Sequence, residues 1–209
     1  MSVDHVEILV EEPSMETALR LLLPKMIEDL SFEIYPYQCK QDLIANLPDR
    51  LRGYRLWLPE NWRVVVLMDR DAEDCRRLKN QLEQMAISAV LKTKSSVHLE
   101  PWVVVNRLAI EELEAWYFGD WAAVHAAYSR VSRTLPYKAR YRDPDAIKGG
   151  TWEAFERILK RAGYFSGGLR KIEAARAIAQ FMTPKINCSK SFQVFRSCLQ
   201  EMVREGKNR

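Results

Sequence analysis

The sequence of 209 residues contains four cysteines and three histidines, and neither residue type occurs at a spacing typical of metal ligands. No two cysteines form a CxxC pair, so we expect neither a zinc site nor a disulfide framework. The chain also lacks any run of about 18 apolar residues that could cross a membrane. Its N-terminus lacks the basic start and long apolar stretch of a secretory signal. These absences predict a cytoplasmic protein with no membrane segment and with reduced cysteines.

Charge is distributed unevenly along the chain, although the net charge is only +4. Residues 1–129 contain 14 Lys and Arg against 21 Asp and Glu, whereas residues 130–209 contain 18 against 7. An acidic half followed by a basic half suits a protein that brings a polyanion to a bound cation. Solvated charge spread over helix surfaces would give the same composition, so the asymmetry alone leaves both interpretations open.

Apolar runs and turn residues predict alternating strands and helices in the first half of the chain. Strands are expected at residues 5–10, 32–38, 63–68, 89–91 and 102–105. Helices are expected after an N-cap at Ser14, over residues 42–51 with a break at Pro48, and over residues 74–85. The run at residues 63–68 is almost continuously apolar, which is typical of a central parallel strand buried on both faces. This order predicts an α/β fold with a parallel sheet flanked by helices.

The second half of the chain has helical periodicity and many basic residues. Helices are expected over residues 110–128 with a possible interruption at Gly119, 152–161 with Thr151 as cap, 169–182 and 191–204. A basic loop at residues 133–150 separates the first two. We therefore divide the chain into an α/β domain at residues 1–108 and a helical, basic part at residues 109–209 that packs on it.

Acidic residues follow two of the predicted strands at the point where each strand ends. Glu11 comes directly after the first strand, and Asp69 and Asp71 come directly after the central strand. In an open parallel sheet, ligands bind beyond the carboxyl ends of the strands, near a switch in strand order. The two aspartates of an extended DxD segment point the same way. Three converging carboxylates repel one another, and a hard cation such as Mg²⁺ removes that repulsion.

Asp74 is a fourth candidate ligand, because it stands at the start of the helix that follows the DxD segment. It either reaches the same sheet edge or stabilises the helix N-terminus as many acidic residues do. A DxD segment alone is a weak signal, since charges after strands are common. Its pairing with an acidic turn after the first strand strengthens the prediction of a metal site.

The segments that carry these carboxylates resemble the Toprim domain of topoisomerases, primases and OLD-type nucleases. They are Leu9-Val10-Glu11 before a turn and helix, and Val66-Leu67-Met68-Asp69-Arg70-Asp71. The chain as a whole is similar to a bacterial family of uncharacterised Toprim-like proteins. The matching segments are Val10-Glu11 with Glu16, residues 40–43, residues 69–75, the ELEAW segment at residues 112–116 with Glu111, residues 149–152 and residues 191–195. Toprim domains usually carry glycine after the first glutamate, and this chain has Glu12 there.

This resemblance implies cleavage of phosphodiester bonds in nucleic acid with the help of Mg²⁺ or Mn²⁺. Glu11 would be a ligand or general base, Asp69 and Asp71 would be ligands, and Glu114 of the ELEAW segment would have a catalytic role. Topoisomerase activity is disfavoured because the chain is too short for the added domain that supplies the tyrosine nucleophile. Primase activity is disfavoured because the usual zinc-binding module is not found in the sequence. Stand-alone Toprim-like proteins often occur beside an ATPase in bacterial anti-phage systems. The alternative is therefore a non-catalytic partner subunit of an ATPase complex.

Each of the other candidates also has a structural alternative. Glu111 and Glu114 stand three residues apart and would share a helix face, either at the metal site or in solvent. Lys148 precedes two glycines and Thr151, so it either approaches a phosphate at a helix N-terminus or lies in a plain loop. Arg140, Arg142 and Lys148, together with Lys171 at the start of a later helix, are the candidate contacts for nucleic acid. The aromatic residues near Trp116 form a core or a platform for bases.

Overall fold

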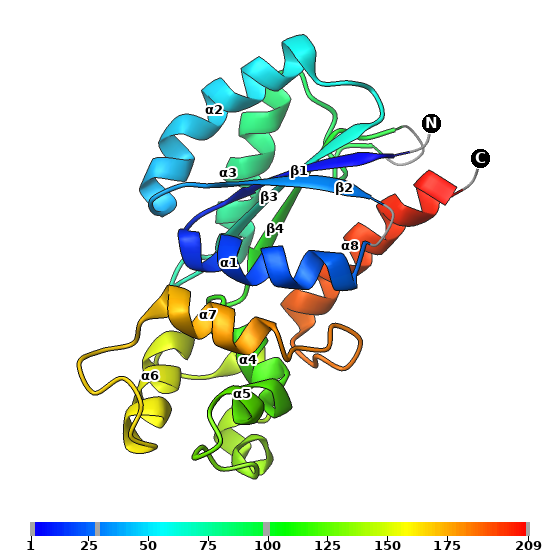
Figure 1. The fold of residues 1–209 in the computed structure, drawn as a ribbon. Helices are drawn as coiled ribbons and strands as arrows, with labels where there is room; N and C mark the ends of the chain where they lie inside the picture. The colour runs from blue at the N-terminus through cyan, green and yellow to red at the C-terminus, as the bar shows by residue number, and fades with distance from the viewer. Residues whose placement is uncertain (1–2, 28–29, 98–100, 208–209) are drawn as a thin grey trace.

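The computed structural model describes residues 3–27, 30–97 and 101–207, with the backbone alone at residues 206 and 207. Four strands form a parallel sheet with the order β2-β1-β3-β4 (Figure 1). They are β1 (His5–Val10), β2 (Ser31–Pro36), β3 (Trp62–Asp69) and β4 (Val104–Ala109). The α/β fold with a parallel sheet flanked by helices is thereby confirmed.

Eight α-helices are described. Those of the first half are α1 (Pro13–Leu22), α2 (Lys40–Trp57) and α3 (Cys75–Ser88). Those of the second half are α4 (Glu114–Gly119), α5 (Trp121–Ala127), α6 (Thr151–Arg161), α7 (Lys171–Ala179) and α8 (Lys190–Lys207). Short 3-10 turns are η1 (Leu23–Lys25), η2 (Leu135–Tyr137), η3 (Ala139–Tyr141) and η4 (Pro144–Ala146). In the part of the chain that the structure describes, no helix has the length and apolarity needed to span a membrane.

The sheet is covered on both faces, which explains why β3 is almost entirely apolar. Side chains alternate along each strand, so Val65 and Leu67 join the cluster on the α1 side while Val64 and Val66 join the cluster with α2 and α3. Figure 1 shows α2 and α3 on one side of the sheet and α1 on the other, with α7 beyond α1. The cluster on the α1 side continues into α7 and α8, so one hydrophobic core runs across the predicted boundary between residues 108 and 109.

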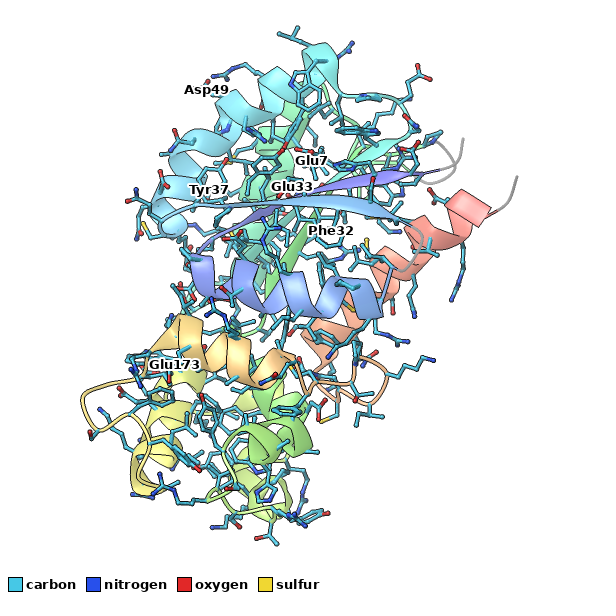
Figure 2. The ribbon with its side chains drawn as sticks, viewed as in Figure 1. Glu7, Phe32, Glu33, Tyr37, Asp49 and Glu173 are labelled. Atoms are coloured by element: carbon cyan, nitrogen blue, oxygen red, sulfur yellow. The ribbon has the colours of Figure 1, made fainter. Side chains whose placement is uncertain are left out.

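Glu7 on β1 is a buried carboxylate whose oxygens are occupied by neighbours. The Tyr54 hydroxyl donates to it at 2.6 Å, and His5 Nε2 lies 3.1 Å from its other oxygen. Figure 2 shows Glu7 between α2 and the sheet. Because these partners satisfy the carboxylate, Glu7 is a structural group and is separate from the acidic residues after the strands.

The predicted break at Pro48 is wrong, since α2 continues from Lys40 to Trp57 with Pro48 inside it. Proline removes one helical hydrogen bond and crowds the preceding turn. The buried side chains Leu43, Leu47 and Leu51 nevertheless form one continuous stripe against the sheet on both sides of the proline. Packing of this stripe outweighs the local preference, as is common for helices in folded proteins.

The predicted strand at residues 89–91 is also wrong. Helix α3 reaches Ser88, and Val90 has a left-handed backbone with φ of 58°. The N–H of Leu91 then donates to the Ala86 carbonyl at 3.1 Å, which closes the helix end as in a Schellman motif. The apolar residues there terminate a helix, and a run of three is too short to distinguish the two structures by periodicity.

The predicted helix at residues 110–128 consists of two helices, and the interruption lies at Gly119 as expected. Asp120 begins α5 by accepting a hydrogen bond from the Ala123 N–H at 3.3 Å. A side chain at Gly119 would place its Cβ 2.8 Å from the Ser189 backbone nitrogen and closer still to Asn187. Close approach of the segment before α8 therefore requires glycine at this position.

Candidate metal centre

The strand order places the ends of β1 and β3 at a switch point. From β1 the chain crosses by α1 to β2 on one side, whereas β3 leads by α3 to β4 on the other side. The two following helices cover opposite faces of the sheet, and open α/β sheets of this kind bind ligands beyond the carboxyl ends of the strands at such a point. Glu11 and Asp69 stand at these two ends. The prediction that both lie at the same edge is confirmed.

A hydrogen bond joins the side chain of Glu11 to the backbone of Asp69. Glu11 Oε2 accepts a hydrogen bond from the Asp69 backbone N–H at 2.9 Å. Both residues are buried, with 9% and 3% of their surface exposed. Asp69 Oδ1 lies inside the protein without a hydrogen-bond partner in the described part of the chain. A buried carboxylate oxygen without a partner is energetically costly, so this atom points to a missing cation or donor.

Glu114 completes a buried acidic triad, by which we mean Glu11, Asp69 and Glu114. It is the first residue of α4, only 2% of its surface is exposed, and its Oε2 has no hydrogen-bond partner among the described residues. Burial raises the pKa of Asp69 well above its usual range, and the negative charges of Glu11 and Glu114 raise it further. Glu114 is therefore a member of the site, and the alternative of a solvent-exposed glutamate is wrong.

Burial also raises the pKa of both glutamates of the triad. The pKa of Glu11 rises to about 7, although the Asp69 N–H and the Lys40 ammonium act in the opposite direction. The pKa of Glu114 also rises to about 7, against the positive charge of Lys171. Desolvation disfavours a charged carboxylate. Without a cation, the triad therefore tends to hold protons near neutral pH.

The DxD segment is not extended through Asp71, so its two aspartates do not point the same way. Asp71 has a left-handed backbone with φ of 52°, and its N–H donates to the Glu111 carbonyl at 2.7 Å. Its side chain is half exposed and pairs with Lys40 Nζ at 2.5 Å. Asp71 therefore lies at the outer rim of the site, while Asp69 lies inside it.

Lys40, the first residue of α2, is buried at this rim. Besides Asp71, its ammonium contacts Glu73 Oε1 at 3.1 Å and the Arg70 carbonyl at 3.2 Å. Although burial lowers it, the hydrogen bond and charge of Asp71 raise the pKa of Lys40 above its usual value. This lysine remains charged and offsets part of the negative charge.

Lys171 has the corresponding role on the other side. Its Nζ pairs with Glu12 Oε2 at 3.2 Å. Although burial lowers it, the charges of Glu114 and Glu12 raise the pKa of Lys171 above its usual value. Lys171 comes from the N-terminus of α7, which packs on α1 (Figure 1). The structure thus brings this predicted phosphate contact to the acidic site, and it pairs Glu12 with a lysine.

The three glutamates at residues 111–114 lie in three different environments, and the predicted shared face of Glu111 and Glu114 is wrong. Glu111 precedes α4 and pairs with Arg70. Glu112 accepts hydrogen bonds from the Thr151 hydroxyl at 2.7 Å and the Trp152 N–H at 2.8 Å. It therefore caps α6 from outside the helix, in the position that a phosphate would otherwise take.

Other predicted site residues lie outside the acidic triad. Asp74 caps α3, since its side chain accepts from the Arg77 N–H at 2.8 Å. Arg140, Arg142 and Lys148 are exposed on the segment between α5 and α6, and no contact joins them to the triad in the described structure. Ser14 does not cap α1, because that helix begins at Pro13 and the Ser14 hydroxyl donates to Glu12.

The donor set fits a hard divalent cation. Carboxylate oxygens alone are ligands that Mg²⁺ and Mn²⁺ accept, and two oxygens of the triad have no other partner. Within the described ranges, no three acidic, histidine or cysteine side chains already surround one point at ligating distances. The residues that would hold the cation are the triad and Asp71. The four cysteines are free, as predicted.

Sequence analysis missed two members of the site. Lys40 lies in a segment that matched the resembled family, but a lysine after a loop gives no indication that its amine is buried. Tyr117 lies one turn after Glu114, and its buried hydroxyl has no hydrogen-bond partner among the described residues. Burial and the charge of Glu114 raise the pKa of Tyr117 well above its usual value, so it remains a neutral donor.

These features define an α/β protein whose parallel sheet carries a buried acidic site at its switch point. A family model described as a domain of unknown function, DUF4276, matches residues 10–202. The chain belongs to that family. No curated protein and no solved structure matches the chain. The likeness to Toprim proteins and the predicted ATPase partner therefore stay predictions.

Proposed function

We propose that the protein cleaves phosphodiester bonds of nucleic acid with the help of a bound divalent cation. The observation that carries this proposal is a pair of buried carboxylate oxygens, Asp69 Oδ1 and Glu114 Oε2, that have no hydrogen-bond partner among the described residues. Asp69 is hydrogen-bonded to Glu11 through its backbone and lies near the charge of Glu114, at the strand ends where an open parallel sheet places its ligands. A bound divalent cation would compensate the charge of these carboxylates, which otherwise tend to be protonated near neutral pH.

Mg²⁺ or Mn²⁺, when bound, supplies positive charge that stabilises the attacking and leaving oxygens of an in-line displacement. Asp69, Glu11 and Glu114 would hold it, with Asp71 at the rim. Glu11 would either ligate the cation or accept a proton from the attacking water. Lys40 and Lys171 would bind phosphate oxygens, since each already places an ammonium beside the carboxylates.

The substrate has to be held along its backbone as well as at the scissile phosphate. Arg140, Arg142 and Lys148 are exposed and have no ion pair in the described part of the chain. Such cations bind phosphates of any sequence, and their contacts weaken steeply as salt rises. This suits a nuclease without base specificity at the cleaved bond.

Labelled single-stranded and duplex DNA and RNA, incubated with the purified protein, test the proposal. Cleavage is expected with Mg²⁺ or Mn²⁺, and it should disappear in EDTA and in Asp69→Asn. The control is Asp49→Asn, because Asp49 lies on α2 away from the site (Figure 2). If all four substrates stay intact with either metal, the nuclease function of the isolated chain is excluded.

The second candidate is a partner subunit that binds a cation without catalysis and acts in a complex with an ATPase. The exposed apolar residues Leu56 and Trp57 at the end of α2 give such a partner a surface to pack against. Co-purification from the native host separates the two functions. An ATPase that elutes with the chain, combined with metal binding but no cleavage by the complex, would favour this candidate.

A further inference from the structure

Beyond the acidic site, the surface is hollowed where α5 meets the segment that follows it. The hollow has a volume of about 550 Å³ and is lined by Trp121, His125, Arg133, Tyr137 and two alanines of α5. The alanines, Ala122 and Ala126, are exposed and one helical turn apart, so they form a flat floor. Figure 1 shows α5 at the end of the molecule opposite α2. This hollow is therefore distinct from the metal site.

The walls of this hollow combine aromatic surface with a fixed cation. Tyr137 is 78% exposed, an unusual position for a large aromatic ring. Trp121 is held in place, since its Nε1 donates to the Ser132 carbonyl at 2.8 Å and its ring stacks on Phe118. Only 5% of the Trp121 surface is exposed, so Trp121 supports the wall of the hollow, and the exposed ring of Tyr137 is the surface on which a flat, planar ligand would stack.

His125 orients the cation of the hollow. Its Nδ1 lies 3.0 Å from the Val131 carbonyl, and its Nε2 lies 2.7 Å from Arg133 Nε. A carbonyl only accepts and a guanidinium only donates, so His125 is the neutral tautomer with the proton on Nδ1. The Arg133 guanidinium is thus held through its Nε, which donates to His125 Nε2. Its two terminal nitrogens have no hydrogen-bond partner among the described residues.

A second hollow lies on the other side of the same segment. It has a volume of about 250 Å³ and is lined by three cations, Arg130, Lys138 and Arg161, and by no carboxylate. The basic segment, residues 130–142, contains five Lys or Arg and no Asp or Glu. None of these five cations forms an ion pair with a carboxylate in the described part of the chain. The uncompensated positive charge of this segment suits a polyanion as the ligand.

We infer that the two hollows bind single-stranded nucleic acid, with one base stacked on Tyr137 in the first hollow and backbone phosphates at Arg133 and in the second. This inference rests on the proposed function, because it names the class of substrate that the hollows would hold for cleavage at the acidic triad. Alternation of an aromatic platform with cations is how proteins hold single strands without regard to sequence. A duplex keeps its bases stacked inside, so it reaches the cations but not the ring of Tyr137.

The distance to the acidic triad is compatible with one continuous strand. Trp121 follows Glu114 by seven residues, so their Cα atoms lie within about 25 Å even for an extended chain. At a rise of about 3.4 Å per nucleotide, about seven nucleotides cover that length. A strand of twelve nucleotides would therefore occupy the hollows and reach the metal site.

Fluorescence anisotropy with labelled 12-nucleotide DNA and RNA in EDTA tests the inference, because binding is measured without cleavage. Loss of one stacked base should weaken binding of Tyr137→Ala by roughly tenfold. Tyr137→Phe retains the ring and should bind like the wild type. Binding of a duplex of the same length should be equal for all three. Since Tyr137 is exposed, none of these changes should lower the melting temperature.

The cations are tested with the double variant Lys138→Ala/Arg161→Ala. It should bind single strands more weakly and show a flatter dependence of affinity on salt, because two phosphate contacts are lost. The matched control, Arg55→Ala/Arg76→Ala, removes two exposed cations from α2 and α3 and should bind like the wild type. Equal weakening by both double variants would overturn the inference, since only net charge would then matter.

The outcomes separate this inference from the nuclease proposal. Tight binding of single strands that depends on Tyr137, without cleavage in Mg²⁺, would support the hollows and reject the nuclease. Cleavage with unchanged binding by Tyr137→Ala would reject the hollows and leave the nuclease. A wild-type protein that binds no strand in EDTA, or that binds a polyglutamate peptide as well as it binds a strand, would overturn the inference.

Discussion

Glu11 accepts a hydrogen bond from the backbone N–H of Asp69 at 2.9 Å, which joins the ends of the two central strands. The bond uses one oxygen of Glu11 and the backbone of Asp69, so it does not occupy the buried side-chain oxygen Oδ1 of Asp69, which has no hydrogen-bond partner among the described residues. It also fixes the distance between the two strand ends, so a cation would meet a preformed pair of carboxylates. The rim residues Asp71 and Glu12 take no part in this hydrogen bond and pair instead with Lys40 and Lys171.

Replacing Asp69 with asparagine should remove metal binding without unfolding the protein. The change neutralises one of three neighbouring carboxylates, so the melting temperature in EDTA should be no lower than that of the wild type. Calorimetry should show affinity for Mn²⁺ at least about tenfold weaker, together with loss of the metal-dependent rise in melting temperature. Asp49→Asn should change neither quantity. A large drop in the EDTA melting temperature would point to a structural role for Asp69.

Stability of the metal-free protein should fall as pH rises from about 4.5 to 7. Glu11 and Glu114 have folded-state pKa values of about 7 against an ordinary value of 4.5, so the folded state binds more protons than the unfolded state in this window. For each of the two glutamates, the loss in the free energy of unfolding over this pH range should be about 3 kcal/mol. Urea denaturation in EDTA at pH 5 and pH 8 measures the difference.

The matched variant for this pH dependence is Glu114→Gln. It should be more stable than the wild type at pH 8 and should show a smaller change between pH 5 and pH 8. Glu60→Gln, at an exposed position, should leave the change as it is. If stability of the wild type rises between pH 5 and pH 8, the triad is already charged in the metal-free state.

Replacing Lys40 with methionine should lower the melting temperature in EDTA and increase the gain on adding Mg²⁺. The side chain keeps its length but loses the charge that pairs with Asp71 and Glu73. One positive charge fewer at the rim favours a divalent cation in the site. Thermal melting with and without Mg²⁺ measures both effects, with the exposed Lys185→Met as control. A smaller gain would mean that Lys40 holds Asp71 in a ligating position.

Two glycine substitutions should have opposite effects on stability. Gly119→Ala forces a methyl group against the Ser189 backbone nitrogen and should destabilise by about 1–3 kcal/mol. Gly53→Ala adds a methyl group inside α2 with no atom within 4 Å, and should stabilise by about 0.5–1 kcal/mol. Chemical denaturation of the two variants gives both values. Equal effects would show that the segment before α8 can move away from Gly119.

The class of fold and the edge at which Glu11 and Asp69 lie follow from the amino-acid pattern alone. The apolar run of β3 requires burial on both faces, and the alternation of strands and helices requires parallel pairing. Parallel strands end at one edge, so residues that follow two such strands are neighbours without any knowledge of the packing. The interruption at Gly119 was also predicted correctly from the sequence, whereas the break predicted at Pro48 was wrong.

Which carboxylates face inward, and which cations neutralise them, depends on how the helices pack in the folded chain. The sequence does not distinguish Glu111, Glu112 and Glu114, which are all glutamates. In the structure the Asp71 N–H bonds to the Glu111 carbonyl and Glu112 contacts the N-terminus of α6, whereas the side chain of Glu114 is buried. The positions of Lys40 and Lys171 depend on α2 and α7 packing against the sheet and α1. Such contacts join residues far apart in the chain, and packing energy outweighed local preference at Pro48 in the same way.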